Sequence, residues 1–126
     1  MEKKVIVSEK SPAAIGPYSQ AIEYNGIVYT SGVIGVNPAT GEVGETIEEQ
    51  TTQVFENLKG LLADTGSSLY QAIKTTVFIK NMDDFAKVNE IYATYFTGAF
   101  PARSCVEVAR LPKDLLIEVE VTAIKG

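Results

Sequence analysis

The sequence predicts a two-layer α+β domain in which one mixed β-sheet carries two helices on a single face. Two amphipathic helical stretches are present, near residues 46–66 and 81–96, and short β-rich runs flank them. The resulting order is β-β-β-α-β-α-β-β. Two helices that each have one apolar side need one apolar sheet face, which gives two layers. A chain of 126 residues can bury such a core, so we expect a single domain over residues 1–126.

The first third of the chain contains the three N-terminal strands. The run at 5–7 is short and apolar and is expected at a sheet edge. Asn25-Gly26 separates the runs at 19–24 and 27–34, and this dipeptide is the one most typical of a two-residue hairpin. Ser31-Gly32 interrupts the second run. A glycine inside a strand marks either a bulge or a close approach of another group, and a plain bulge is the simpler interpretation.

The two helices have clear sequence signals. Thr46 followed by Glu49 is a capping box, and Gly66 is suited to end the helix that it begins. The second helix begins at Asn81 or Met82. Its apolar stripe is interpreted as core rather than as a cofactor site, and it consists of Phe85, Val88, Ile91, Tyr92, Tyr95 and Phe96.

The last strands are expected at 72–79, 103–109 and 116–124. We predict that the final two form a hairpin across the turn at 111–114. In that register the face without helices receives Arg103, Cys105, Glu107, Glu118 and Glu120, and the core receives Ser104, Val106 and Val108. A cation and three carboxylates on such a face are costly to bury unless they are paired, and a slip of one residue would separate them.

Arg103 directly follows Phe100-Pro101-Ala102 at the start of a strand. A guanidinium on a rigid strand is suited to bind a carboxylate or a phosphate in a bidentate manner. The alternative is a structural salt bridge at the strand end, and this segment alone favours that alternative.

Several classes of function are excluded by composition. The chain has no histidine and one cysteine, which removes the usual zinc sites and the Cys-His and Ser-His nucleophile pairs. We therefore expect no zinc site of the usual kind. The net charge of −5 argues against nucleic-acid binding. No apolar run approaches a membrane span, and residues 1–5 lack the apolar stretch of a signal peptide, so a cytoplasmic location without membrane association is expected.

The open face of the predicted sheet indicates self-association. In the last strand Ile117, Val119 and Val121 lie on one face, while Leu116 and Ile124 lie on the other. Apolar residues on both faces favour an oligomer in which subunits cover the face that the helices leave free.

Motifs along the whole chain resemble the reactive intermediate deaminase family, in its RidA branch, also called YjgF or endoribonuclease L-PSP. The segments that carry the resemblance are Ala13 to Gln20, Thr30-Ser31-Gly32, Thr76 to Ile79, Asp84 to Asn89 and Phe100 to Pro112. The Pro-Ala-Arg-Ser segment is the most specific of them.

The resemblance implies a chorismate-mutase-like fold, a homotrimer with ligand sites between subunits, and hydrolysis of 2-iminobutanoate, 2-iminopropanoate and the related enamines to 2-keto acids and ammonia. It implies that Arg103 binds the substrate carboxylate and that Glu118 positions or activates water. Because a protonated imine is already electrophilic, this chemistry requires neither a metal nor a cofactor. The resemblance further implies that the pocket is lined by Tyr18, Ser31, Gly32, Asn89 and Cys105. Cys105 has no partner in the sequence that would activate its thiol, so we expect it to contribute shape.

Three functions remain open at this point. The first is an imine and enamine deaminase, and the second is a binding or sensing protein for 2-keto acids that uses the same Arg103. The third is an endoribonuclease or translation inhibitor, which the acidic charge and the missing histidine disfavour. Glu118 discriminates between the first two, because only catalysis needs its basicity.

Overall fold

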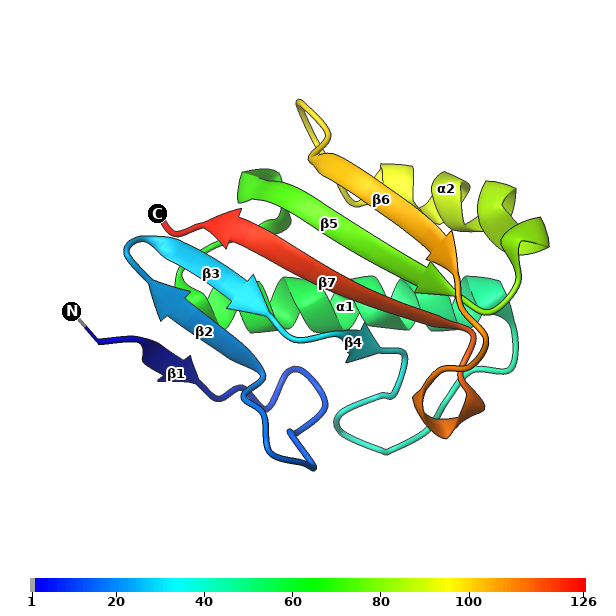
Figure 1. The fold of residues 1–126 in the computed structure, drawn as a ribbon, viewed down its shortest axis with the longest axis horizontal. Coiled ribbons are helices and arrows are strands. Elements are labelled where there is room, and N and C mark those ends of the chain that lie inside the picture. Colours follow the sequence, from blue (N-terminus) through cyan, green and yellow to red (C-terminus); the bar gives the residue numbers. More distant parts are fainter. Residues whose placement is uncertain (1) are drawn as a thin grey trace.

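The secondary structure of the chain follows the predicted order, with the run at 27–34 divided into two strands (Figure 1). This computed structural model describes residues 2–126; Met1, the first residue of the segment in which no signal peptide is expected, lies outside them. The strands are β1 (Lys4–Ile6), β2 (Ala21–Tyr24), β3 (Ile27–Thr30), β4 (Val33–Ile34), β5 (Ala72–Ile79), β6 (Ala102–Glu107) and β7 (Ile117–Ile124). The helices are α1 (Ile47–Thr65) and α2 (Phe85–Thr94).

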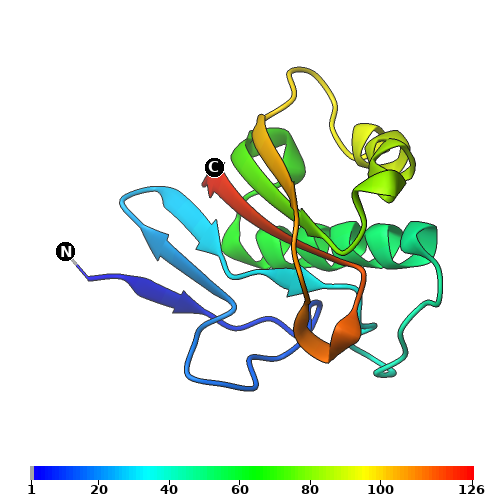
Figure 2. The ribbon, with the colours of Figure 1, turned by 45° about the vertical axis from the view of Figure 1, so that its right-hand side comes forward.

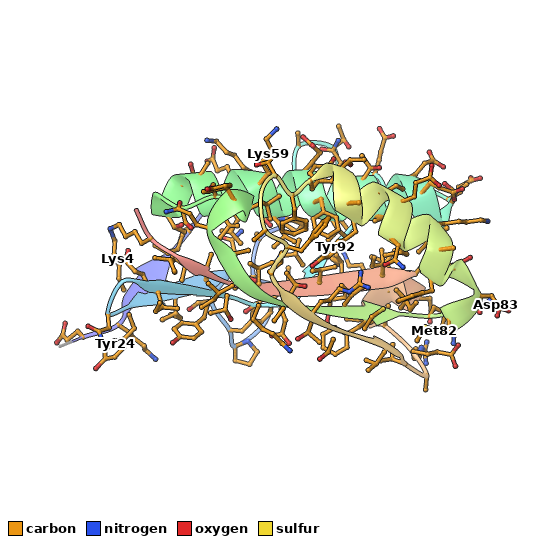
Figure 3. The ribbon with its side chains drawn as sticks, turned by 90° about the horizontal axis from the view of Figure 1, so that it is seen from above. Lys4, Tyr24, Lys59, Met82, Asp83 and Tyr92 are labelled. Atoms are coloured by element: carbon orange, nitrogen blue, oxygen red, sulfur yellow. The ribbon has the colours of Figure 1, made fainter. Side chains whose placement is uncertain are left out.

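The strands form one mixed sheet in the order β1-β2-β3-β7-β5-β6, and β4 pairs with β7 beyond the end of β3. Among the strands of the described residues, only β5 and β6 run parallel to each other. β1 lies at one edge and β6 at the other (Figure 2). Both helices lie on one side of the sheet, and the labelled Tyr92 is between α2 and the strands while Tyr24 is on the opposite side (Figure 3). The predicted two-layer α+β class is therefore confirmed.

The local signals in the sequence form the expected turns and caps. The Thr46 side chain accepts a hydrogen bond from the Glu49 amide, and the Glu49 carboxylate accepts one from the Thr46 amide, which completes the capping box. Gly66 ends α1 with φ +82°. Asn25 and Gly26 have φ values of +54° and +80°, as a two-residue hairpin turn requires.

Ser31-Gly32 forms a bulge, as the simpler interpretation predicts. Tyr29 lies opposite Thr122, whereas Val33 lies opposite Val119, so residues 30–32 face only two residues of β7. The Thr30 hydroxyl accepts a hydrogen bond of 2.9 Å from the Val121 amide and so replaces a missing bond of the ladder. The bulge gives Ser31 and Gly32 their position beside β7.

The predicted hairpin between the last two strands is wrong. β5 lies between β6 and β7 and pairs with both, in parallel with β6 and antiparallel with β7. The reason is that α2 carries the chain back along the sheet after β5, so β6 starts at the same end as β5 and runs beside it as a βαβ unit. The segment 108–116 then crosses to the other side of β5.

The predicted sharing of one face by Arg103, Cys105, Glu107, Glu118 and Glu120 is consequently also wrong. Thr75 and Val77, which are fully buried under the helices, lie directly opposite Arg103 and Cys105. Phe78 lies opposite Glu118 and belongs to the other face. Glu118 and Glu120 thus lie on the open face. Arg103, Cys105 and Glu107 lie on the face that the helices cover.

The core positions predicted for the strand 103–109 are likewise wrong. Ser104 and Val106 are exposed on the open face, and Val108 lies beyond the end of β6 and is half-buried. By contrast, Ile117, Val119 and Val121 of β7 are buried beneath the helices as predicted.

The open face of the sheet carries large apolar side chains that no segment of residues 2–126 covers. Among them are Val5, Tyr24, Tyr29, Val106 and Ile124, each at least 42% exposed. In the part of the chain that the structure describes, neither α1 nor α2 has the length and apolar character that crossing a bilayer requires.

Candidate active site

Arg103 is held at the edge of the sheet by side chains of α2. Its Nη1 donates a hydrogen bond of 2.7 Å to Asn89 Oδ1. Its Cζ lies 4.7 Å from the ring centre of Tyr92 and 5.4 Å from that of Phe85. A cavity of about 330 Å³ opens beside it, which we call the Arg103 cavity, lined by Asn89, Tyr92, Ala93, Phe100, Pro101 and Arg103.

Within residues 2–126, no carboxylate pairs with this guanidinium. The ion pairs within residues 2–126 join Lys10 to Asp64, Arg110 to Asp114 and Lys125 to Glu23. The structural salt bridge considered for Arg103 is therefore not present in the described chain. A half-buried cation without an anionic partner is suited to take its anion from a ligand.

Cys105 lies two residues further along β6, on the same face as Arg103, and is half-buried. Burial raises the pKa of its thiol, while the charge of Arg103 lowers it to a smaller extent. The net effect keeps the sulfur protonated at neutral pH, which does not favour a nucleophile.

Glu118 lies at a second cavity, of about 290 Å³, which we call the Glu118 cavity. Tyr18, Ser31, Gly32 and Glu118 all line it. The carboxyl of Glu118 lies directly beside the Cα of Gly32. A Cβ added to Gly32 would be only 2.6 Å from Glu118 Cδ. The bulge thus also provides a close approach of another group, so both interpretations of this glycine apply.

The carboxyl of Glu118 is suited to proton transfer. Burial, and to a smaller extent the negative charge of Glu120, raise the pKa of Glu118 above its usual value. Glu120 lies two residues along β7 on the same face. A carboxylate with a raised pKa is a stronger base near neutral pH, as general acid–base catalysis requires.

Gln20 organises the wall of the Glu118 cavity and has no signal in the sequence. Its buried side-chain amide donates to the carbonyls of Ser8, Ser11 and Pro12 and accepts from the Ser8 amide, at 2.8–3.1 Å. The backbone carbonyl of Gln20 accepts a hydrogen bond of 2.9 Å from the backbone amide of Ser31. Glutamine is usually a surface residue, so only the fold reveals that Gln20, directly before β2, holds the preceding loop.

The structure separates the seven expected site residues into two groups. Arg103, Asn89 and Cys105 lie together near the outer edge formed by β6 and α2. Glu118, Gly32, Ser31 and Tyr18 lie together at the bulge and the loop before β2. Within one chain these groups are on opposite faces of the sheet, so a site that uses both needs two copies of the chain.

These features define a small α+β protein with an arginine that lacks an anionic partner at a sheet edge and a half-buried glutamate beside a bulge, each lining a cavity. The chain belongs to the endoribonuclease L-PSP family, whose model matches residues 8–125. This confirms the resemblance seen in the sequence motifs.

Individual relatives are similar over nearly their whole length. A 2-iminobutanoate/2-iminopropanoate deaminase of Salmonella typhimurium is 49% identical over 97% of this chain and 98% of its own. The crystal structure of a conserved Rid family protein from Yersinia pestis is 51% identical, covers 98% of this chain and 99% of its own, and has a TM-score of 0.95. The structure of Escherichia coli TdcF with bound serine is 41% identical over 98% of this chain and 99% of its own, with a TM-score of 0.93.

Proposed function

We propose that this chain is a hydrolase acting on C–N bonds, a deaminase that converts 2-iminobutanoate, 2-iminopropanoate and the related enamines to 2-keto acids and ammonia. The observation that carries the proposal is the unpaired guanidinium of Arg103 beside an open cavity. The relatives of Salmonella and Escherichia coli that carry this activity in their names support it, at 49% and 48% identity. Such imines are released by pyridoxal-phosphate enzymes, and the proposal places this chain in the cytoplasm.

The proposed chemistry assigns separate tasks to the two groups of residues. Arg103 binds the substrate carboxylate through two parallel N–H donors. The Glu118 carboxylate takes a proton from water while the water oxygen bonds to the protonated imine carbon, which gives a tetrahedral amino alcohol. Glu118 returns the proton to the nitrogen. The C–N bond then breaks to release ammonia while the Glu118 carboxylate takes the hydroxyl proton and the carbonyl of the 2-keto acid forms. This proton passes to the released ammonia, which leaves as ammonium and restores the carboxylate. An enamine first takes a proton at its β-carbon to become the imine.

The remaining site residues shape and orient the bound imino acid. Asn89 and Cys105 line the pocket beside Arg103, and Tyr18, Ser31 and Gly32 line it beside Glu118. The imine is already electrophilic when protonated, so binding and proton transfer suffice, and the proposal includes no metal or cofactor.

The proposed active form is a homotrimer with the site between subunits. The exposed apolar face of the sheet supports this assembly, as does the placement of Arg103 and Glu118 on opposite faces. In a ring of identical subunits, the Arg103 cavity of one subunit faces the Glu118 cavity of the next. The ligand is a small imino or keto acid, and neither a nucleic acid nor a membrane is a proposed partner.

A second candidate function is the binding or sensing of small carboxylates without turnover. The serine bound to TdcF favours a site for a small amino-acid-like carboxylate in that protein. Arg103 would serve this function equally well, whereas the raised pKa of Glu118 would have no purpose in it.

A coupled assay distinguishes the two functions. A serine or threonine dehydratase generates 2-aminoacrylate or 2-iminobutanoate, and the decay of the imine is followed with and without this protein. We expect decay to accelerate in proportion to the amount of wild-type protein and not with Arg103→Ala. Unchanged decay, together with saturable binding of 2-oxobutanoate, would contradict the deaminase and favour the binding protein.

A further inference from the structure

One stripe of α2 is directed at a single residue of β6. Phe85, Asn89 and Tyr92 are spaced i, i+4 and i+7 and therefore lie along one side of the helix. All three contact the guanidinium of Arg103, the two rings at 5.4 and 4.7 Å and the amide oxygen at 2.7 Å. The sequence pattern shows Phe85 and Tyr92 only as core.

Tyr92 is the most firmly fixed of the three. It is 5% exposed, and its phenol shares a buried hydrogen bond of 2.7 Å with the Thr75 hydroxyl. Thr75 lies directly opposite Arg103 on the neighbouring strand. The rings of Phe55 and Phe96 pack on Tyr92 at 5.4 and 4.6 Å. The ring therefore cannot turn away from the arginine without breaking a buried hydrogen bond and aromatic packing.

A ring face stabilises a guanidinium without occupying its N–H donors. A carboxylate in the same place would neutralise the charge and use the donors that a bound anion needs. Asn89 accepts one N–H from Nη1 and carries no charge. Burial raises the pKa of Tyr92, so its phenol stays neutral beside the cation.

We infer that Tyr92 is a positioning residue for Arg103, that Thr75 fixes the Tyr92 ring against the guanidinium, and that Phe85 supports it from the outer end of the stripe. The identity of the bound carboxylate rests on the proposed function, whereas the contact between Arg103 and Tyr92 does not. The ring holds the guanidinium in place and leaves its remaining donors for the carboxylate of the substrate.

The first test observes the guanidinium directly and needs no ligand. The chain has two arginines, Arg103 and Arg110, so an NMR spectrum of the arginine Nε–Hε groups contains one reporter and one internal reference. Arg110 is exposed and pairs with Asp114. We expect Tyr92→Leu to move the Arg103 signal, because the ring current is lost, and to leave the Arg110 signal in place.

Tyr95→Leu is the matched control for this measurement. Tyr95 is also an aromatic residue at the end of α2, although it is half-buried where Tyr92 is buried. It stacks on Phe55 at 5.2 Å and does not contact Arg103. We expect the Arg103 signal to move in Tyr92→Leu and to stay in place in Tyr95→Leu. If the signal is unchanged in both variants, the inference is overturned, whether or not the protein is a deaminase.

The second test measures affinity and turnover. We expect Tyr92→Leu to weaken binding of 2-oxobutanoate and to raise KM by about tenfold, as loss of a desolvated cation–π contact implies, while kcat changes by less than about threefold. Tyr92→Phe keeps the ring and should stay within about threefold of wild type in KM. A fall in kcat at unchanged KM, or equal losses for the leucine and phenylalanine variants, would overturn the inference.

Phe85→Leu keeps the inference testable if Tyr92→Leu does not fold. Phe85 is 36% exposed, so its replacement leaves the core intact. We expect KM to rise by about twofold to threefold, since a more exposed cation–π contact is weaker. An unchanged KM would count against a role of Phe85 in supporting Arg103. If wild-type protein neither binds 2-oxobutanoate nor hydrolyses imines, the proposed function fails, and the arginine spectrum still decides the role of Tyr92.

Discussion

Arg103 and Glu118 lie on opposite faces of one sheet, although they are separated by only one strand. Arg103 is opposite Thr75 of β5 and Glu118 is opposite Phe78 of the same strand, and these two β5 residues point to different sides. No rotation of side chains brings the two groups into one site within a single chain. The relationship therefore makes the oligomer a requirement of the proposed chemistry.

Subunit complementation tests this requirement. Arg103→Ala and Glu118→Gln should each be nearly inactive alone, but co-expression should restore about one quarter of wild-type activity, because about one interface in four then combines an intact Arg103 with an intact Glu118. The measurement is turnover of 2-iminobutanoate by the purified mixture, with sedimentation to establish the trimer. A mixture no more active than its components, or a stable monomer at micromolar concentration, would refute the inter-subunit site.

The bidentate role proposed for Arg103 predicts a loss even with a conservative change. Arg103→Lys keeps the charge but replaces the planar fork by a point charge, so we expect kcat/KM to fall by at least about tenfold, and Arg103→Ala to abolish hydrolysis. Circular dichroism and sedimentation should show the fold and the assembly intact. Arg110→Lys is the control, since Arg110 is exposed and pairs only with Asp114. Near-wild-type turnover by Arg103→Lys would place the carboxylate elsewhere.

Replacement of Glu118 and of Cys105 should have unequal effects. Glu118→Gln preserves volume and hydrogen bonding but removes basicity, so turnover should fall by roughly a hundredfold while 2-oxobutanoate still binds. Cys105→Ala should retain substantial activity, because burial raises the pKa of the thiol and the sulfur contributes shape. The reverse ranking would indicate covalent addition of the thiol to the imine carbon.

The sequence predicts the parts of this fold that depend on neighbours along the chain. Thr46 and Glu49 cap α1, and Asn25-Gly26 makes the hairpin, because each signal acts over a few residues. The pairing of β6 with β5 is not local. A four-residue turn before β7 favours a hairpin, and only the crossover through α2 explains why β6 lies beside β5 instead.

The same distinction applies to the site. The Pro-Ala-Arg-Ser motif identifies Arg103, but the helical periodicity of α2 shows only which of its side chains point inward. That Tyr92 and Phe85 meet an arginine, and that Gln20 ties the loop at residues 8–12 to the pocket wall, depend on contacts between distant segments. Once the sheet order is known, the register places Thr75, the partner of Tyr92, opposite Arg103.

The acid limb of the pH–rate profile should depend on Glu120. Catalysis needs the Glu118 carboxylate, so the rate falls as pH drops through its raised pKa. Glu120→Gln removes the smaller of the two effects that raise the pKa of Glu118 and leaves the effect of burial. The acid limb should therefore move to lower pH without reaching the position of an unperturbed carboxyl. An unmoved limb would mean that Glu118 is not the group that titrates.

The same pKa has a consequence for stability. The folded protein binds the Glu118 proton more tightly than the unfolded chain does, so stability falls as pH rises through the window between the unfolded and folded pKa values, and the cost persists above it. Glu118→Gln should therefore raise the melting temperature at neutral pH relative to wild type, and this gain should shrink below that window. An equal gain at all pH values would exclude titration of Glu118 as the cause.

Gly32 should be necessary for the position of Glu118. A Cβ at residue 32 would lie 2.6 Å from Glu118 Cδ, so Gly32→Ala must displace the carboxylate. The displaced atoms are at the far end of a flexible side chain, and the φ of Gly32 is not in the left-handed region, so the cost in stability should be below about 1 kcal/mol. Misplacing the base from its water should nevertheless lower kcat by at least about tenfold.

Gly60→Ala is the matched control for that prediction. An added Cβ at Gly60 of α1 would lie 2.6 Å from Lys10 Cβ, which is equally crowded, but Gly60 lines neither the Arg103 cavity nor the Glu118 cavity. We expect Gly60→Ala to change thermal stability and to leave kcat unchanged, and Gly32→Ala to do the reverse. Full activity in Gly32→Ala would show that Glu118 does not act from its place across this glycine, because the carboxylate cannot remain there beside a methyl group.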